Sequence, residues 1–102
     1  MKNKVHGTNH FDRWFKKLDK ATQGRMNRRI ARAKGGNFGE VEASSDGILE
    51  MKLRFGSGYR IYYFQRGPNE YIVLIGGIKD TQQRDFDTAK ALKRIIEKGG
   101  TC

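Results

Sequence analysis

The sequence predicts an α+β fold in which an antiparallel sheet of about four strands packs against an N-terminal helical hairpin and is followed by a C-terminal helix. Two observations lead to this prediction. Apolar residues recur with the helical period before Asn37, and beyond it they alternate with period 2 until a second helical pattern closes the chain. At 102 residues, the chain is expected to form a single domain over residues 1–102.

The first part of the chain predicts two helices. Residues 1–8 are polar apart from Val5, and we expect either a frayed end or a short edge strand. An apolar stripe then marks a helix that Thr8 or Asn9 can cap: Phe11, Trp14, Phe15 and Leu18. A second helix is expected from about Ala21 to the Gly35–Gly36 stop. It turns Met26, Ile30 and Ala33 inward and four arginines mostly outward: Arg25, Arg28, Arg29 and Arg32.

The middle of the chain predicts strands separated by turn residues. Val41 opens one strand, which a turn over residues 44–47 ends. Two alternating strands follow between Ile48 and Gln65, joined at Gly56–Gly58, and a further turn lies at residues 67–69. The apolar run Tyr71–Ile75 is typical of an interior strand. A closing helix is expected from about Thr81 to Lys98, with helices on one side of the sheet.

The two alternating strands predict one apolar face and one charged face. Residues two apart share a face of a strand, so Glu50, Lys52 and Arg54 should project together, away from the apolar residues between them. The return strand should bring Arg60 and Tyr62 to the same charged platform. Such a platform suits a phosphate backbone and unstacked bases. Because Arg60 is placed on its surface, we expect truncation of Arg60 to impair function at little cost to the core.

The composition favours an anionic partner. Lys and Arg total 21 against 11 Asp and Glu, a net charge of +10, which indicates nucleic acid or an acidic protein, although a merely solvated basic surface is the alternative. The single cysteine, Cys102, allows no intramolecular disulfide. The chain has no apolar run near the roughly 20 residues of a membrane span, and residues 1–10 lack the hydrophobic middle that a signal peptide would need. We therefore expect a cytoplasmic protein with no membrane partner.

Common metal and cofactor sites find little support in the sequence. His6 and His10 with one cysteine do not make a structural zinc site, and no phosphate-binding loop or nucleophile elbow is present. Asp80, Asp85 and Asp87 could bind a metal ion, but acidic residues are favoured at a helix start. The prediction is therefore no metal and no cofactor.

What remains is a cationic and polar set: Lys52, Arg54, Arg60, Tyr62, Lys79, Gln82 and Arg84. Cleavage of RNA by its own 2′-hydroxyl needs a proton acceptor, a group that stabilises the phosphorane-like transition state and a donor for the leaving oxygen. Cations can fill the second role without a metal, and a lysine whose pKa is lowered by neighbouring charges can fill the others. Simple neutralisation of phosphates or carboxylates is the alternative, and the spacing alone favours binding over catalysis.

Five motifs in order over residues 11–96 carry a family resemblance: F-D-R-W-F-K-K-L from Phe11, G-N-F-G-E from Gly36, G-I-L-E-M-K-L-R from Gly47, G-S-G-Y-R-I-Y-Y from Gly56 and G-G-I-K-D-T-Q-Q-R-D from Gly76. The sequence resembles the RelE/ParE superfamily, toxin components of type II toxin–antitoxin systems. It looks most similar to the HigB-like branch, often called addiction module killer proteins. The resemblance implies a compact α+β domain and, for ribosome-dependent members, cleavage of messenger RNA in the decoding centre.

The resemblance also implies roles for individual residues. It assigns them to the basic residues Lys52, Arg54, Arg60 and Lys79. Together with the cationic and polar set above, we expect catalytic roles for Arg54, Arg60 and Lys79, and RNA-binding roles for Lys52, Tyr62, Gln82 and Arg84. Tyr62 could stack a base, while Gln82 and Asp85 could position the substrate, Asp85 being equally a residue of a first helical turn. The chain departs from the RelE branch at two positions: Asp80 replaces an arginine and Phe86 replaces a catalytic tyrosine. Ile78 likewise replaces the usual aspartate of the HigB-like branch.

Three functions compete. The leading prediction is a toxin that acts as a metal-independent, ribosome-dependent endoribonuclease on translated mRNA. Its expected partners are the ribosome, mRNA and a cognate antitoxin, expected to be a helix-turn-helix protein encoded nearby. The first alternative is a ParE-like gyrase poison, which binds a topoisomerase and cuts nothing, because one scaffold hosts both activities. The second is a catalytically degenerate RNA-binding or antitoxin-binding module, which the replacements at Asp80 and Phe86 favour.

Overall fold

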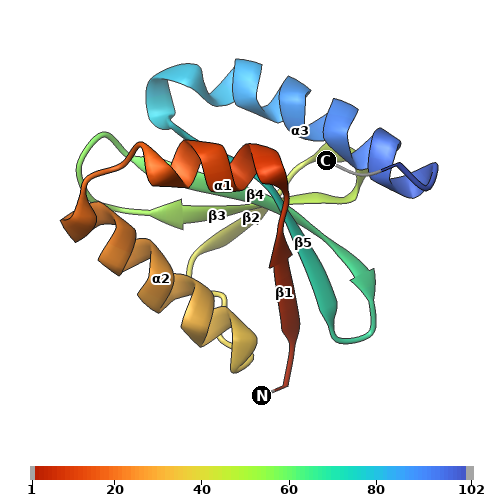
Figure 1. Ribbon diagram of the computed structural model, residues 1–102, viewed down its shortest axis with the longest axis horizontal. Helices are drawn as coiled ribbons and strands as arrows, with labels where there is room; N and C mark the ends of the chain where they lie inside the picture. Colours follow the sequence, from red (N-terminus) through yellow and green to blue (C-terminus); the bar gives the residue numbers. More distant parts are fainter. Residues whose placement is uncertain (1, 101–102) are drawn as a thin grey trace.

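The computed structural model describes residues 2–100, so Cys102 lies outside the described residues. Within this range the chain forms a sheet, three α-helices and two short 3-10 helices (Figure 1). In chain order the elements are β1 (Lys4–Gly7), α1 (Asn9–Lys16), α2 (Lys20–Lys34), β2 (Val41–Ala43), η1 (Ser45–Gly47), β3 (Ile48–Leu53), β4 (Tyr59–Gly67), β5 (Glu70–Ile78), η2 (Lys79–Thr81) and α3 (Gln82–Glu97). No helix among residues 2–100 is long and apolar enough to cross a membrane.

The helical hairpin forms as predicted, and polar side chains set where its helices begin. Thr8 rather than Asn9 caps α1: its Oγ1 accepts a hydrogen bond from the Phe11 backbone N–H at 3.0 Å and donates one to the Leu74 carbonyl at 2.6 Å. Asp19 caps α2 by accepting from the Thr22 backbone N–H at 2.9 Å. The Thr8 bond to β5 fixes α1 against the sheet.

The sheet has five strands in the order β1-β5-β4-β3-β2, and it is mixed. Strands β2 to β5 form the predicted antiparallel ladder, but β1 adds to the edge of β5 in parallel, with Val5 opposite Tyr71. The predicted α+β fold class is confirmed, and the sheet differs from the expected antiparallel sheet of about four strands by this one parallel strand. Of the two outcomes expected for residues 1–8, the edge strand is the one observed. Figure 1 shows β1 beside β5.

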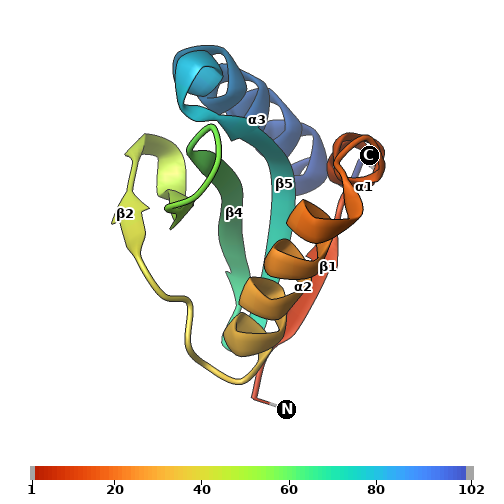
Figure 2. The same ribbon diagram turned by 90° about the vertical axis from the view of Figure 1, so that its left-hand side faces the viewer.

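Helices cover both faces of the sheet, which corrects the prediction that they lie on one side. Ile61 and Tyr63 of β4 pack into a core with α1 and α2, whereas Tyr62 and Phe64 pack into a second core under α3. In Figure 2, α3 lies at the top of the view and α2 in the lower half, in front of β1 and β5. The face expected to be a charged platform is thus largely a second core, and its charged part is confined to one end.

Two adjacent glycines of β5 let the helices approach the sheet from opposite faces. A Cβ at Gly76 would lie 2.1 Å from Cζ3 of Trp14 on α1, and one at Gly77 would lie 1.8 Å from Oδ2 of Asp85 on α3. Since neither contact is sterically possible, glycine is required at both positions. The close approach of α3 brings η2 and the first turn of α3 beside β3, where the charged end of the face remains.

Candidate functional site

A hollow of about 360 Å³ lies where β3 meets η2 and the first turns of α3. Its lining residues come from three separate parts of the chain: Ser44, Glu50, Lys79, Asp80, Gln82, Gln83 and Phe86. We call this hollow the Glu50 pocket. It exists because α3 begins only at Gln82, so the helix covers Tyr62 and Phe64 but leaves the end of the same face open.

Glu50 is the buried carboxylate of the pocket. Glu50 is 3% exposed, and its neighbour Arg60 is 6% exposed. The Arg60 Nε donates to Glu50 Oε2 at 3.0 Å, and the Gln82 Nε2 donates to both carboxylate oxygens at 3.1 and 2.9 Å. A second Arg60 nitrogen, Nη1, donates to the Gly58 carbonyl at 3.0 Å. Glu50 is therefore held in one orientation by two side chains, as a buried charge requires.

Lys79 supplies an exposed cation beside Arg60. Its backbone N–H donates to the Ser57 carbonyl at 3.3 Å, which ties η2 to the β3–β4 turn. A Cβ at Gly58 would lie 3.2 Å from the Lys79 Cβ and 3.4 Å from the Arg60 Nη1, so the two cationic residues flank this glycine. Among residues 2–100, Lys79 has no carboxylate partner at ion-pairing distance. Its ammonium group is available to an anion.

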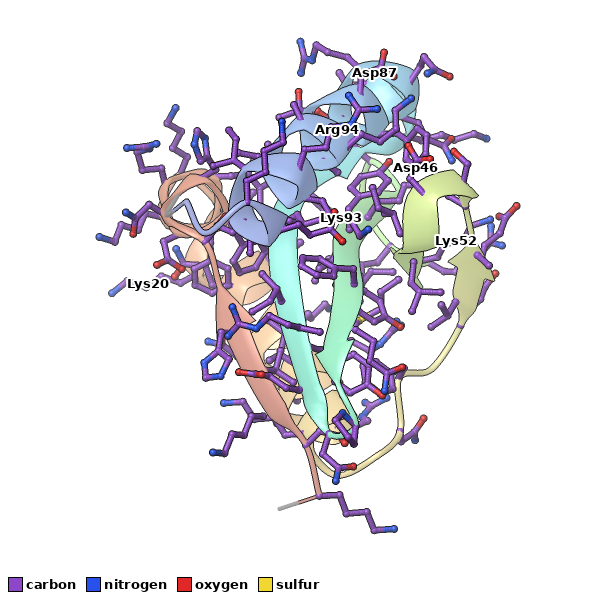
Figure 3. All side chains as sticks on the ribbon, turned by 90° about the vertical axis from the view of Figure 1, so that its right-hand side faces the viewer. Lys20, Asp46, Lys52, Asp87, Lys93 and Arg94 are labelled. Atoms are coloured by element: carbon purple, nitrogen blue, oxygen red, sulfur yellow. The ribbon has the colours of Figure 1, made fainter. Side chains whose placement is uncertain are left out.

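Lys52 lies next to this group but is engaged by a carboxylate. It is opposite Arg60 in the β3–β4 register, and its Nζ forms an ion pair with Glu42 of β2. The hydrogen bond from Lys52 lowers the pKa of Glu42 below its usual value. Figure 3 shows Lys52 beside β2, at the opposite edge of the sheet from β1. Lys52 is therefore close to the pocket without lining it.

Tyr62 is placed where it cannot stack an RNA base. The residue has no exposed surface, and it packs in the core under α3. Its hydroxyl donates a long hydrogen bond, 3.4 Å, to the Gln82 carbonyl. Burial raises the pKa of Tyr62 well above its usual value, and the negative charges of Glu50 and Asp85 raise it further. The expectation of base stacking by Tyr62 is contradicted by this burial, since α3 covers the ring.

Two of the predicted site residues, Arg54 and Arg84, lie away from the Glu50 pocket. Strand β3 ends at Leu53, so the alternation of faces no longer fixes the direction of Arg54, which forms an exposed ion pair with Glu40. Arg84 is exposed and lines a different hollow beside Trp14, between α1 and α3. The structure thus brings together Arg60, Lys79 and Gln82 of the predicted site residues, with Lys52 adjacent.

The two departures from the RelE pattern both reach the pocket. Asp80 and Phe86 line it, so the missing arginine and the missing hydroxyl affect the site directly. Asp85 does not line this hollow. It is 5% exposed, lies against Gly77 and accepts a hydrogen bond of 2.5 Å from Thr81 Oγ1, which supports its interpretation as a first-turn residue that fixes the η2–α3 junction. Among residues 2–100, no group of three or more His, Cys, Asp or Glu side chains could hold a metal ion.

The sequence analysis gives Glu50 no role, because the excess of Lys and Arg directs attention to cationic side chains. The available signal was a carboxylate in a strand whose neighbours on that face are Ile48 and Lys52. In the structure Glu50 supplies a buried carboxylate, Lys79 supplies an exposed ammonium group, and Arg60 and Gln82 hold the carboxylate. Groups of these kinds can serve as the proton acceptor, the cation and the proton donor that cleavage of a phosphodiester by a neighbouring hydroxyl requires.

The fold is that of the RelE toxin. The structure is similar to the crystal structure of the isolated E. coli RelE toxin, with a TM-score of 0.63 and 18% identity over 91% of this chain and 98% of that chain. It is also similar to a chain of the intact E. coli RelBE toxin–antitoxin complex, with a TM-score of 0.63 and 15% identity over 74% of this chain and 95% of that chain. The fold implied by the resemblance is therefore confirmed.

Sequence comparison identifies the family. Residues 13–98 match the family described as "Phage derived protein Gp49-like (DUF891)". The chain is also 38% identical over 97 residues to an uncharacterized protein of Haemophilus influenzae (strain Rd), covering 94% of this chain and 98% of that protein. This chain belongs to the Gp49-like family. Assignment to the HigB-like branch stays a prediction.

Proposed function

We propose that this protein is the toxin of a type II toxin–antitoxin system and a metal-independent endoribonuclease that cuts translated mRNA on the ribosome, in the cytoplasm. The observation that supports this function is the Glu50 pocket, in which a buried carboxylate lies beside a buried guanidinium and an exposed lysine. A protein that only neutralised phosphates would need the cations but no buried carboxylate beside them. The similarity to the RelE fold is consistent with the proposal.

The residues of the pocket divide the reaction among them. Glu50 accepts the proton of the RNA 2′-hydroxyl, whose oxygen attacks the adjacent phosphorus. Lys79 stabilises the charge that develops on the phosphate oxygens and donates a proton to the departing 5′-oxygen, so that a cyclic phosphate and a 5′-hydroxyl are formed. Arg60 and Gln82 position Glu50. Because Arg54 lies outside the pocket, this mechanism gives it no step.

We expect cleavage of mRNA only when ribosomes are present. Phe86 lacks a hydroxyl, and the pocket is formed from a few side chains at the end of one face, so it offers little to hold a flexible RNA in line for attack. Such alignment can supply roughly 7–11 kcal/mol of the barrier, which the decoding centre would have to provide. The measurement is a map of mRNA 5′ ends in a purified translation system with and without ribosomes.

The control for this experiment is a metal chelator, at a concentration that leaves the ribosomes intact by sedimentation. Cleavage should continue at the same rate, since the positive charge at the site comes from side chains. Efficient cutting of naked RNA, or cutting that stops with the chelator while ribosomes persist, would contradict the mechanism. Trapped gyrase–DNA complexes without any RNA cleavage would support the ParE-like alternative instead.

We also expect tight binding of an acidic segment of a cognate antitoxin, which we propose to be a helix-turn-helix protein encoded nearby. With a net charge of +10, the encounter should be accelerated by opposite potentials. The association rate should therefore fall as ionic strength rises, since the Debye length shortens from about 30 Å at 0.01 M to about 10 Å at 0.1 M. Stopped-flow measurements over this range test the prediction. A rate that is independent of salt would show that the charge does not serve this partner.

A further inference from the structure

A second hollow, of about 250 Å³, lies between α2 and the end of β3 and shares no lining residue with the Glu50 pocket. Leu53, at its base, packs into the core with α1 and α2, so this hollow opens on the face of the sheet opposite to α3. Its remaining lining consists of one aromatic ring and five arginines: Phe55, Arg25, Arg28, Arg29, Arg32 and Arg54. We call it the arginine groove.

The charge of the groove is concentrated on α2. Four of its arginines lie at i, i+3, i+4 and i+7, which forms one stripe along the helix. The helix from Lys20 to Lys34 contains no Asp or Glu, and like charges at i, i+4 destabilise a helix. Among residues 2–100, the exposed Arg25, Arg28 and Arg32 have no carboxylate at ion-pairing distance. An external anion would relieve this repulsion.

One arginine of the groove is fixed before any ligand arrives. Arg29 Nη1 donates to the Lys52 carbonyl at 2.7 Å and Nη2 donates to the Phe38 carbonyl at 3.0 Å, so the guanidinium is anchored by backbone groups and its charge is not neutralised by them. Its Nε is buried and has no hydrogen-bond partner among the described residues. Burial lowers the pKa of Arg29, and the charge of Arg32 lowers it further. Arg29 therefore places a fixed positive charge at the base of the groove.

Arg25 adds a flat surface to this charge. Its Cζ lies 4.6 Å from the centroid of the Phe55 ring, so the aromatic side chain supports the guanidinium from below. Nucleic-acid bases stack on guanidinium planes and aromatic rings, whereas the carboxylates of an acidic peptide bind the N–H edge of a guanidinium and do not use its plane. A groove with both fixed cations and a stacking surface therefore favours an unpaired nucleic-acid strand over an acidic protein segment.

We propose that the arginine groove is a second RNA-binding surface, which takes a single-stranded segment with its phosphates against Arg28, Arg29 and Arg32 and one base on Arg25. The choice of RNA over DNA rests on the proposed function, whereas the choice of an unpaired strand rests on the Arg25–Phe55 contact. The groove and the Glu50 pocket lie on opposite faces of β3, so a strand in the groove is bound outside the site of cleavage.

Binding to the free protein tests this proposal without any cleavage. A short unstructured RNA with a fluorescent label is titrated by anisotropy over a series of salt concentrations. Arg28→Gln/Arg32→Gln should weaken binding roughly tenfold and reduce the slope of log K against log salt by about 1.4, since each lost contact to a single-stranded phosphate contributes about 0.7. Arg25→Lys should weaken binding roughly tenfold with an unchanged slope, because it keeps the charge and removes the plane.

The matched control removes the same charge elsewhere. Arg13→Gln/Arg94→Gln changes two exposed arginines on α1 and α3. If this variant loses as much affinity as Arg28→Gln/Arg32→Gln, net charge alone explains binding and the groove is not a site. Tighter binding of duplex RNA, of DNA of the same sequence or of an acidic peptide would each overturn the assignment to single-stranded RNA. If a groove variant loses RNA binding but still cleaves mRNA on the ribosome, the proposed function stands without depending on the groove. If the free protein binds RNA in the groove but does not cleave mRNA on the ribosome, the groove assignment stands and the proposed function fails.

Discussion

Lys79→Ala should reduce the rate of mRNA cleavage on the ribosome about 10²- to 10³-fold while leaving the thermal unfolding temperature unchanged. The side chain is exposed, and the structural bond of this residue is made by its backbone N–H to the Ser57 carbonyl, which alanine retains. The loss should therefore fall on transition-state stabilisation and not on folding. Cleavage is measured as a single-turnover rate in a purified translation system, and growth arrest on expression provides the cellular readout.

Two variants make this result specific to the pocket. Lys98→Ala removes one positive charge from an exposed position beyond the end of α3 and should leave cleavage unchanged. Lys79→Arg keeps the charge, so it should cleave faster than Lys79→Ala. It should still cleave more slowly than the wild-type protein, because the shape of the cation differs. A Lys79→Ala protein that cleaves at the wild-type rate would remove Lys79 from the mechanism.

The fold could be predicted almost completely because its elements are encoded locally. Periodicity indicates the helices and the antiparallel strands, and glycines and polar turns indicate their ends. As an example of this accuracy, α2 begins only one residue before its expected start. Strand β1 could be predicted only as one of two alternatives, because a four-residue edge strand buries little and Val5 is its one residue that packs against the core. Its parallel pairing with β5 depends on the path of the chain through both helices, which no local pattern records.

The site was less predictable because alternation assigns a residue to a face without showing what covers that face. Arg60 and Tyr62 were placed correctly on the same face as Glu50 and Lys52. That this face lies under α3 follows from the packing of Ala89 and Leu92 against the sheet, which is a tertiary property. Tyr62 is consequently a core residue, and Arg60 is a buried ion-pair partner of Glu50. The expectation that Arg60 lies on an open surface was therefore wrong.

Arg60→Met should consequently destabilise the protein, by about 3–5 kcal/mol in the free energy of unfolding, because it leaves the Glu50 carboxylate buried without its cation. Glu50→Leu should cost a similar amount, since it leaves the Arg60 guanidinium unpaired. The double variant Glu50→Leu/Arg60→Met should be more stable than either single variant, because an apolar pair of similar volume leaves no uncompensated charge. It still loses the hydrogen bonds from Gln82, and a hydrogen bond to a charged acceptor contributes about 1.5–3 kcal/mol. Urea denaturation of the four proteins measures these differences.

Cleavage assays on the same four proteins separate the two roles of the pair. If Glu50 accepts the proton and Arg60 positions it, the double variant regains stability and regains no activity, since the carboxylate is absent. Arg60→Lys tests the positioning role directly, because it keeps a cation for Glu50 but loses the guanidinium edge that bonds both Glu50 and the Gly58 carbonyl. This variant should remain folded and cleave slowly. A double variant that cleaves mRNA at the wild-type rate would show that the buried pair serves only the fold and that the chemistry lies elsewhere.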